Sequence, residues 1–442
     1  MAQATFHFPR GFLWGTATSS HQNEGNNQNN NWWRWEQQPE RIIDDSESGL
    51  ACDWWNGRWR EDFDRAAETN QNAHRLSIEW SRVQPTPERW DENAIDRYRE
   101  MLRGLQDREL TPLVTLHHFT NPRWVEDQGG WENPEVSAWF TTYVSKMVEA
   151  LREYASLWIT INEPNVLVGL AYASDAFPPG KHSLASSVRA TTNLVRAHAS
   201  AYKAIHSLQP QARVGLAVQI RPMLPRSPRW PLDRLVASLA DRNLNHLFTE
   251  ALVSGKLRFP GWRKRLPEVK GTQDFLGINY YTRDLVNFSL WHPMQFFARR
   301  SFARDADLSD TGFIANDPSG MFQVLKWASR YKLPIIIAEN GVDNADDRLR
   351  PRYIIEHLHQ VWRAANFNWQ VKGYFYWTLV DNFSWNRGWT QRYGLWELDP
   401  QTQTRRRRPS VDLYAEICQE NGISSDMVAH YAPEILEKLF PD

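Results

Sequence analysis

The chain has 442 residues, with 51 Lys and Arg against 52 Asp and Glu, so its formal net charge is −1. A balanced charge creates no global field toward nucleic acid or an anionic membrane, and we expect neither as a partner. The longest apolar stretches, such as 333–338, are far shorter than the roughly 18 residues of a membrane span, and no signal-peptide core is evident. These features predict a soluble cytoplasmic protein.

Eight short apolar segments of strand character recur along the chain, separated by stretches long enough for helices, such as 93–108 and 135–154. This alternation predicts parallel strands joined by helical crossovers that bury both faces of the sheet. The predicted strands are 12–18, 73–78, 113–118, 157–161, 214–218, 275–279, 335–338 and 374–379.

Eight such units average about 55 residues each, which is generous for an α/β fold of the (β/α)8 (TIM) barrel type. We therefore predict one barrel domain over 1–442, with long βα loops that include 23–31, 221–231 and 291–318. The segment 424–440 has spaced apolar residues and predicts a surface helix. The run of arginines at 405–408 predicts solvated surface.

Polar residues stand repeatedly at the ends of the predicted strands, where the loops of such a barrel build its site. Two of them are glutamates that end apolar runs: Glu163 in Thr-Ile-Asn-Glu-Pro and Glu339 in Ile-Ala-Glu-Asn-Gly. Two carboxyl groups in unlike environments can protonate a departing glycosidic oxygen and stabilise the sugar carbon. The other strand-end residues are Gln22, Glu24, Arg75, His118, Asn162, Asn279, Tyr281 and Trp377.

Six ordered motifs resemble those of family 1 glycoside hydrolases, a family of retaining β-glucosidases and β-galactosidases. They are Phe-Leu-Trp-Gly-Thr-Ala-Thr-Ser-Ser at 12–20, Arg-Leu-Ser-Ile-Glu-Trp-Ser-Arg at 75–82, Val-Thr-Leu-His-His at 114–118, Thr-Ile-Asn-Glu-Pro at 160–164, Asp-Phe-Leu-Gly-Ile-Asn-Tyr-Tyr at 274–281 and Ile-Ala-Glu-Asn-Gly at 337–341. The resemblance extends over nearly all of residues 8–414.

The resemblance implies that Glu339 is the nucleophile and Glu163 the general acid and base, with Arg75 and Tyr281 in contact with the nucleophile. A cation and a hydroxyl donor would keep Glu339 ionised, and the nearby negative charge would keep Glu163 protonated. The residues expected to bind the sugar are Gln22, His118, Asn162, Asn279, Trp377, Ser384 and Trp385.

Two positions depart from the family pattern, and both concern the sugar. Ser384 stands where the family usually has a glutamate that binds the sugar's 4- and 6-hydroxyls, and Phe119 replaces a tryptophan. A serine at 384 resembles the 6-phospho-β-glycosidase branch, in which Tyr393 is also found, but the lysine of that branch is Gln391 here. Arg387 is an alternative anion partner.

The sequence thus favours a retaining exo-β-glycosidase, most similar to β-glucosidases, that acts on a small β-glycoside. A glycosidase for 6-phosphorylated or other 6-anionic sugars, a transglycosylase and a catalytically silent sugar-binding barrel are alternatives. No cofactor is implied. No metal site is expected either, because His117 and His118 are adjacent on a predicted strand and would face opposite sides. The sequence leaves the oligomeric state open.

Overall fold

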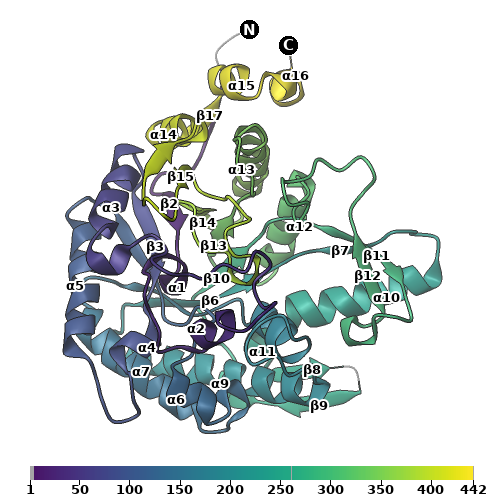
Figure 1. The fold of residues 1–442 in the computed structure, drawn as a ribbon. Coiled ribbons are helices and arrows are strands. Elements are labelled where there is room, and N and C mark those ends of the chain that lie inside the picture. Colours follow the sequence, from purple (N-terminus) through teal and green to yellow (C-terminus); the bar gives the residue numbers. More distant parts are fainter. Residues whose placement is uncertain (1–3, 260, 442) are drawn as a thin grey trace.

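The computed structural model describes residues 4–259 and 261–441. Its centre is a closed barrel of eight parallel strands in the order β10-β13-β14-β2-β3-β4-β5-β6 (Figure 1). These strands are β2 (Leu13–Ala17), β3 (Ala73–Ser77), β4 (Thr111–Thr115), β5 (Leu157–Asn162), β6 (Arg213–Gln219), β10 (Phe275–Asn279), β13 (Ile335–Asn340) and β14 (Val371–Trp377). All eight predicted strands are present, so the predicted (β/α)8 barrel is confirmed.

Helices cover the outside of the barrel, as parallel strands buried on both faces require. Nearly every residue of the eight strands is buried, and the outer ring packs pairwise, for example α7 on α9 and α12 on α13. The helices of this ring are α3 (Trp59–Glu68), α5 (Glu92–Gln106), α7 (Val136–Leu151), α9 (Leu184–Leu208), α11 (Leu247–Ser254), α12 (Pro318–Ser329), α13 (Arg350–Asn366) and α14 (Ser410–Glu420).

Shorter elements follow several strands at the C-terminal end of the barrel. They are α1 (Ser20–Asn23), α2 (Asn31–Glu36), α4 (Trp80–Val83), α6 (Arg123–Asp127) and α8 (Pro164–Leu167). Two hairpins, β8 (Lys256–Phe259) with β9 (Trp262–Arg265) and β15 (Trp396–Leu398) with β16 (Arg405–Arg407), lie outside the barrel sheet. The short helices and the hairpin β15–β16 lengthen the βα loops, as the length of the chain predicted, whereas β8–β9 lies between α11 and β10.

Two of the predicted loops are wrong in part, because they carry strands. The segment 221–231 contains β7 (Met223–Pro225), and 291–318 contains β12 (Ala298–Ser301). Both join β11 (Asp284–Phe288) in a three-stranded sheet of order β12-β11-β7, against which α10 (Pro231–Asp241) packs. Pairing between segments so distant in sequence leaves no local periodic signal.

The predicted strand 113–118 is too long. The strand β4 ends at Thr115, and the chain then turns with Phe119 at a φ of +70°. His117 and His118 therefore follow the strand instead of belonging to it, although they still face opposite sides. His117 lies edge-on against Trp131 and Phe140, whereas His118 is stacked with Trp377.

The predicted helix over 424–440 is broken. It consists of α15 (Ser425–Tyr431) and α16 (Leu436–Leu439), separated by a turn that begins at Pro433. Proline cannot donate the helical hydrogen bond, and Ala432 before it has a non-helical φ of −152°. The segment is fastened to the other end of the chain, because β1 (Thr5–His7) pairs with β17 (Gly422–Ser424) and Phe6 stacks on Phe440.

The arginine run at 405–408 is not uniformly solvated, so that prediction is also wrong in part. The side chain of Arg405 is fully buried and forms an ion pair with Asp62 at 3.1 Å. Arg408 donates to both carboxylate oxygens of Asp381, at 3.0 and 2.9 Å. Arg406 and Arg407 are the two of this run that are exposed to solvent.

Candidate active site

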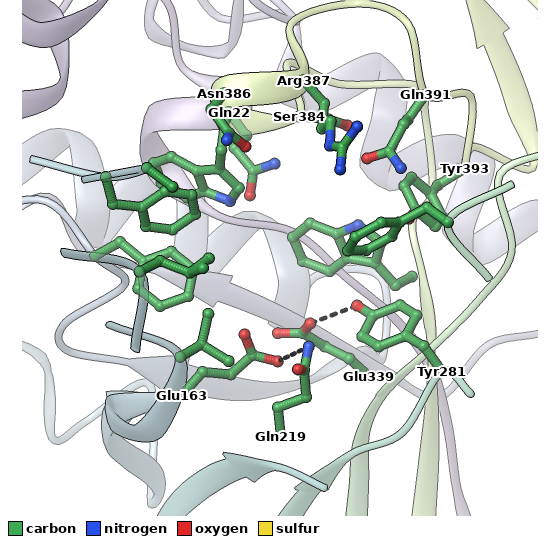
Figure 2. A pocket seen from close by; sticks show the side chains of 18 of the residues that line it. Gln22, Glu163, Gln219, Tyr281, Glu339, Ser384, Asn386, Arg387, Gln391 and Tyr393 are labelled. Carbon is green, nitrogen blue, oxygen red and sulfur yellow. Dashed lines mark hydrogen bonds between the residues drawn. The ribbon is translucent and has the colours of Figure 1, made fainter. Parts of the chain in front are cut away.

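A pocket of about 300 Å³ opens at the C-terminal end of the barrel. Figure 2 shows Glu163 and Glu339 together on one side of it, with Ser384, Arg387 and Gln391 on the opposite side. Residues at or just after the ends of six barrel strands reach it, as the fold predicts. Of the predicted site residues, Gln22, His118, Glu163, Tyr281, Glu339, Trp377, Ser384 and Trp385 line the pocket.

Glu339 lies near the end of β13, and both of its carboxylate oxygens are occupied by donors. The guanidinium of Arg75, from β3, lies 2.6 Å from Oε1, and the hydroxyl of Tyr281 donates to Oε2 at 2.6 Å. Arg75 is completely buried, and it also donates to the Ala338 carbonyl at 3.0 Å and to Thr115 Oγ1 at 3.0 Å. A buried cation with this many partners is fixed in position, so it holds the carboxylate in one orientation.

Glu163 directly follows β5 and caps the short helix α8. Its backbone is left-handed, with a φ of +43°, and its N–H donates to the Ala217 carbonyl at 2.8 Å. Among the described residues, the hydrogen-bond donors to its side chain are two neutral amides, Asn279 Nδ2 at 2.8 Å and Gln219 Nε2 at 3.4 Å. A non-glycine residue with positive φ is uncommon, and here it directs the carboxyl into the pocket.

The two carboxyl groups therefore differ in electrostatic environment. Burial, reinforced by the charge of Glu339, raises the pKa of Glu163 from 4.5 to about 8. Burial also raises the pKa of Glu339, but Arg75 and Tyr281 oppose that rise by stabilising its charged form. When the pair holds one proton, the group that faces only amides takes it, so Glu163 is the acid and Glu339 the carboxylate.

Asn162 connects the two halves of the site. Its Oδ1 accepts from Arg75 Nη2 at 2.7 Å and from Asn279 Nδ2 at 3.1 Å, and its Nδ2 lies 3.1 Å from His118 Nε2. Burial lowers the pKa of His118 well below 6.5, so this imidazole is neutral near pH 7. Its Nδ1 is buried and, within 4–259 and 261–441, has no hydrogen-bond partner, which leaves it available to a ligand.

Aromatic rings form one wall of the pocket. His118 lies between Trp377 and Trp385, with centroid separations of 6.0 and 5.9 Å and nearly parallel planes. Phe119 packs edge-on against Trp385, at 5.2 Å. Flat apolar rings suit the C–H faces of a pyranose. Phe119 stands where the family usually has a tryptophan. Its ring packs against Trp385 but, unlike an indole, offers no N–H donor.

Two polar residues of the predicted set have different local roles. Gln22 is oriented by its neighbours, since it donates to the Phe383 carbonyl at 2.7 Å and accepts from Ser19 Oγ at 2.6 Å. The hydroxyl of Ser384 is buried and has no hydrogen-bond partner among the described residues. Of the predicted residues, Asn162, Asn279 and Arg75 support the pocket from behind, as the contacts above show, and are not among its lining residues.

Several pocket residues were not predicted. Gln219 is the last residue of β6, so the rule that located the other strand-end groups could have found it. Arg221, Phe313 and Asn386 come from loops and carried no signal in the sequence. The lining also includes the apolar residues Val166, Leu170, Ala176, Phe177 and Phe313.

Over 4–259 and 261–441, no group of three or more His, Cys, Asp or Glu side chains is arranged to hold a metal ion. In the same residues, every helix is too short or too polar to cross a bilayer.

A (β/α)8 barrel in which two buried carboxyl groups of unlike protonation face one pocket is typical of glycoside-cleaving enzymes. The chain belongs to glycosyl hydrolase family 1, because the model of that family matches residues 4–423. The resemblance found in the six motifs is thereby confirmed.

Named relatives and solved structures agree with this assignment. Beta-glucosidase A of Thermotoga maritima is 31% identical over 445 residues, covering 94% of this chain and 98% of that protein. A beta-galactosidase of Sulfolobus acidocaldarius is 29% identical, covering 95% of this chain and 96% of that protein. A beta-glycosidase structure from Pyrococcus horikoshii has a TM-score of 0.90 and 38% identity, covering 97% of this chain and 98% of that one.

Proposed function

We propose that this chain is a retaining exo-β-glycosidase that hydrolyses terminal β-linked sugars of small glycosides, with β-glucosides as its principal substrates. The observation that carries the proposal is the unequal environment of the two carboxyls. Glu339 is held by an arginine and a tyrosine hydroxyl, whereas Glu163 contacts only amides and has a pKa of about 8.

In the first step, Glu339 attacks the anomeric carbon while Glu163 protonates the departing glycosidic oxygen. The C–O bond to the aglycone breaks as the bond to the Glu339 oxygen forms, and the proton of Glu163 leaves with the aglycone. Arg75 donates a hydrogen bond to Oε1 of Glu339, and Tyr281 donates one to Oε2. Both carboxylate oxygens of the nucleophile are therefore held in place before the substrate binds.

In the second step, the glycosyl ester on Glu339 is hydrolysed. Ester formation removes the negative charge of Glu339, which is one of the causes that raise the pKa of Glu163. The ionised form of Glu163 is then favoured, and it takes a proton from the incoming water. Water attacks the anomeric carbon, the ester bond breaks, and two displacements restore the original β configuration.

The sugar preference rests on the comparisons. The relative from Thermotoga maritima is named a β-glucosidase and that from Sulfolobus acidocaldarius a β-galactosidase, and these names favour neutral hexosides over 6-phosphorylated sugars. His118, Trp377 and the unpartnered hydroxyl of Ser384 are the groups that we assign to sugar contact. Asn279 and Asn162 do not line the pocket and would orient the two carboxyl groups. Gln22 and Trp385 line the pocket and would also contact the sugar.

A panel of aryl glycosides tests the proposal. The β-glucoside should be cleaved faster than its 6-phosphate, and the first-released sugar should have the β configuration by NMR. A 2-deoxy-2-fluoro glycoside should inactivate the enzyme and label Glu339 in a peptide map. Inversion at the anomeric carbon, or a label on another residue, would contradict the mechanism.

We also propose that residues 1–442 act as one catalytic domain. The family match spans 4–423, and the pairing of β1 with β17 joins the two ends of the chain. The cytoplasmic location remains a prediction from the sequence.

A further inference from the structure

A small lobe stands beside the barrel, on the right in Figure 1. It consists of α10 and the sheet β12-β11-β7, which the chain forms between β6 and β13. The lobe has its own small core, in which Val236 and Ala237 of α10 pack against Val286 and Ala298 of the sheet. The local fold is thus stabilised separately from the barrel core.

Large apolar side chains of this lobe point into solvent. Trp291 is 91% exposed and Leu290 70% exposed, and both lie in the loop between β11 and β12. On α10, Leu232 and Leu235 are exposed whereas Val236 and Ala237 are buried, and the exposed Trp230 precedes the helix. Exposed apolar residues are unremarkable singly, but several on one small unit indicate a contact surface.

These two groups of side chains lie at the same end of the lobe. The buried carboxylate of Asp233, in the first turn of α10, accepts from the backbone N–H of Phe288 at 2.8 Å and from that of Ser227 at 3.2 Å. Phe288 is the last residue of β11, directly before the loop that carries Leu290 and Trp291. The start of α10 and the tip of the hairpin are therefore neighbours.

The lobe also has more arginines than acids, although the whole chain is nearly neutral. Residues 223–241 and 284–304, which include the lobe, contain six arginines and three acids, and two of these acids, Asp233 and Asp284, are buried. Arg229, Arg234 and Arg299 are exposed, whereas the arginine ion pairs of the lobe in the described residues are those of Asp284 with Arg221 and Arg300. Their charge is therefore available to a partner.

We propose that this surface docks on an anionic lipid bilayer, with Trp291, Leu290, Leu232 and Leu235 entering the interface and Arg229, Arg234 and Arg299 binding the headgroups. A membrane surface has anionic headgroups outside an apolar interior. Arginine side chains bind the headgroups, and tryptophan and leucine side chains enter the apolar layer below them. A second copy of this chain fits less well, because a symmetric contact would bring the two sets of arginines together.

The position of the lobe connects docking with the pocket. Arg221 lines the pocket directly before β7, and its guanidinium donates to Asp284, the first residue of β11, at 2.8 Å. Phe313, another pocket residue, lies 5.3 Å from the same guanidinium. The base of the lobe is thus part of the pocket wall, so docking would hold the entrance close to the membrane.

Co-sedimentation of the full chain with vesicles tests the proposal. Vesicles of phosphatidylcholine alone are compared with vesicles containing about 30 mol% phosphatidylserine at about 0.1 M salt. We expect about 100-fold tighter partitioning to the anionic vesicles, since each of three arginines contributes about a fivefold factor. The triple variant Arg229→Gln/Arg234→Gln/Arg299→Gln should lose that difference, and Leu290→Ser/Trp291→Ser should weaken partitioning at least about tenfold.

The matched controls are Phe367→Ser and Arg406→Gln, which remove an exposed ring and an exposed arginine outside the lobe. Both should partition like the wild type, and all variants should keep their activity on a soluble aryl glycoside, which verifies folding. Failure to sediment with anionic vesicles, or equal sedimentation of lobe and control variants, would overturn the proposal. The proposal would also be overturned if the wild type does not bind vesicles and a lobe variant has a different molar mass from the wild type in light scattering. That result would indicate that the lobe mediates self-association.

Discussion

The pocket and the lobe use the same residue types in opposite ways. In the pocket, Arg75 is fully buried and contacts Glu339, Asn162 and Thr115, so its charge is neutralised and its position fixed. In the lobe, Arg229 and Arg299 are exposed, and the described residues offer them no acidic partner. Tryptophan shows the same contrast: Trp377 is 5% exposed and Trp291 91% exposed.

This contrast separates two kinds of recognition. A small ligand is bound best by groups whose orientation is fixed beforehand, which burial and hydrogen bonding achieve. An extended, fluid surface needs no fixed orientation, and it is bound by exposed charge and by apolar side chains that can enter it. Variants in the pocket should therefore change turnover, and variants in the lobe should change location alone.

The largest expected effect is that of Glu339→Gln. The amide keeps the shape of the side chain but cannot form the glycosyl ester, so kcat should fall by roughly 10⁵-fold. Steady-state turnover of an aryl β-glucoside measures this loss. Unchanged thermal unfolding would show that the fold is intact, and turnover close to that of the wild type would refute the assignment of the nucleophile.

Glu163→Ala should have a large effect that depends on the leaving group. Glycosylation by a substrate with an acidic phenol should persist, whereas an alkyl glycoside should lose roughly 10³-fold in kcat/KM, because its alkoxide needs the proton. Added azide should restore turnover and give a β-glycosyl azide, which NMR identifies. An α-azide product would show that Glu163 is not the base on this face.

Tyr281→Phe should have an intermediate effect. It removes the 2.6 Å hydrogen bond to Glu339 Oε2, which stabilises the charged form, so the pKa of Glu339 should rise. The acidic limb of the kcat/KM profile should then move to higher pH, with kcat reduced by roughly 10- to 100-fold. A purely structural role would lower activity equally at every pH.

The basic limb of the same profile should report Glu163. Its protonated form is the active acid, so glycosylation should decline as the pH rises through the pKa of about 8, approaching tenfold per unit above it. In Glu163→Ala, assayed with an acidic phenol as leaving group, this limb should disappear. If the basic limb of the pH profile persists in Glu163→Ala, it reports the titration of a group other than Glu163.

The smallest effect is expected in the lobe. Leu290→Ser/Trp291→Ser should leave kcat/KM for a soluble aryl glycoside within about twofold of the wild type, because neither side chain lines the pocket. A loss of more than tenfold with unchanged unfolding temperature would mean that the lobe takes part in small-substrate binding, and the contrast between the two regions would fail.

The sequence predicted much of the barrel and of its site, because both depend on local patterns. Buried parallel strands are short apolar runs, and the fold gathers the residues that end them at one face. Glu163, Glu339 and Tyr281 were found in this way. Gln219 obeys the same rule and was overlooked, since the predicted strand stopped at residue 218, one residue before β6 ends.

Other features had no local signal. The burial of Arg405 and Arg408 beside Asp62 and Asp381 depends on partners more than 25 positions away. The exposure of Trp291 and the arginines of the lobe depends on a sheet formed by β7, β11 and β12. The near-zero net charge predicted that no anionic surface would be bound. Our proposal for the lobe departs from that prediction, because a sum over the chain cannot show where the charges lie.

The amino-acid sequence by itself determined the order of strands and helices, the family, and the residue types at the strand ends, since these follow from short-range periodicity and motif spacing. The tertiary structure alone decided that Glu163 faces amides, and which arginines are neutralised and which are exposed. Burial and proximity between distant segments set both outcomes, because the energy of a charge depends on what surrounds it in space.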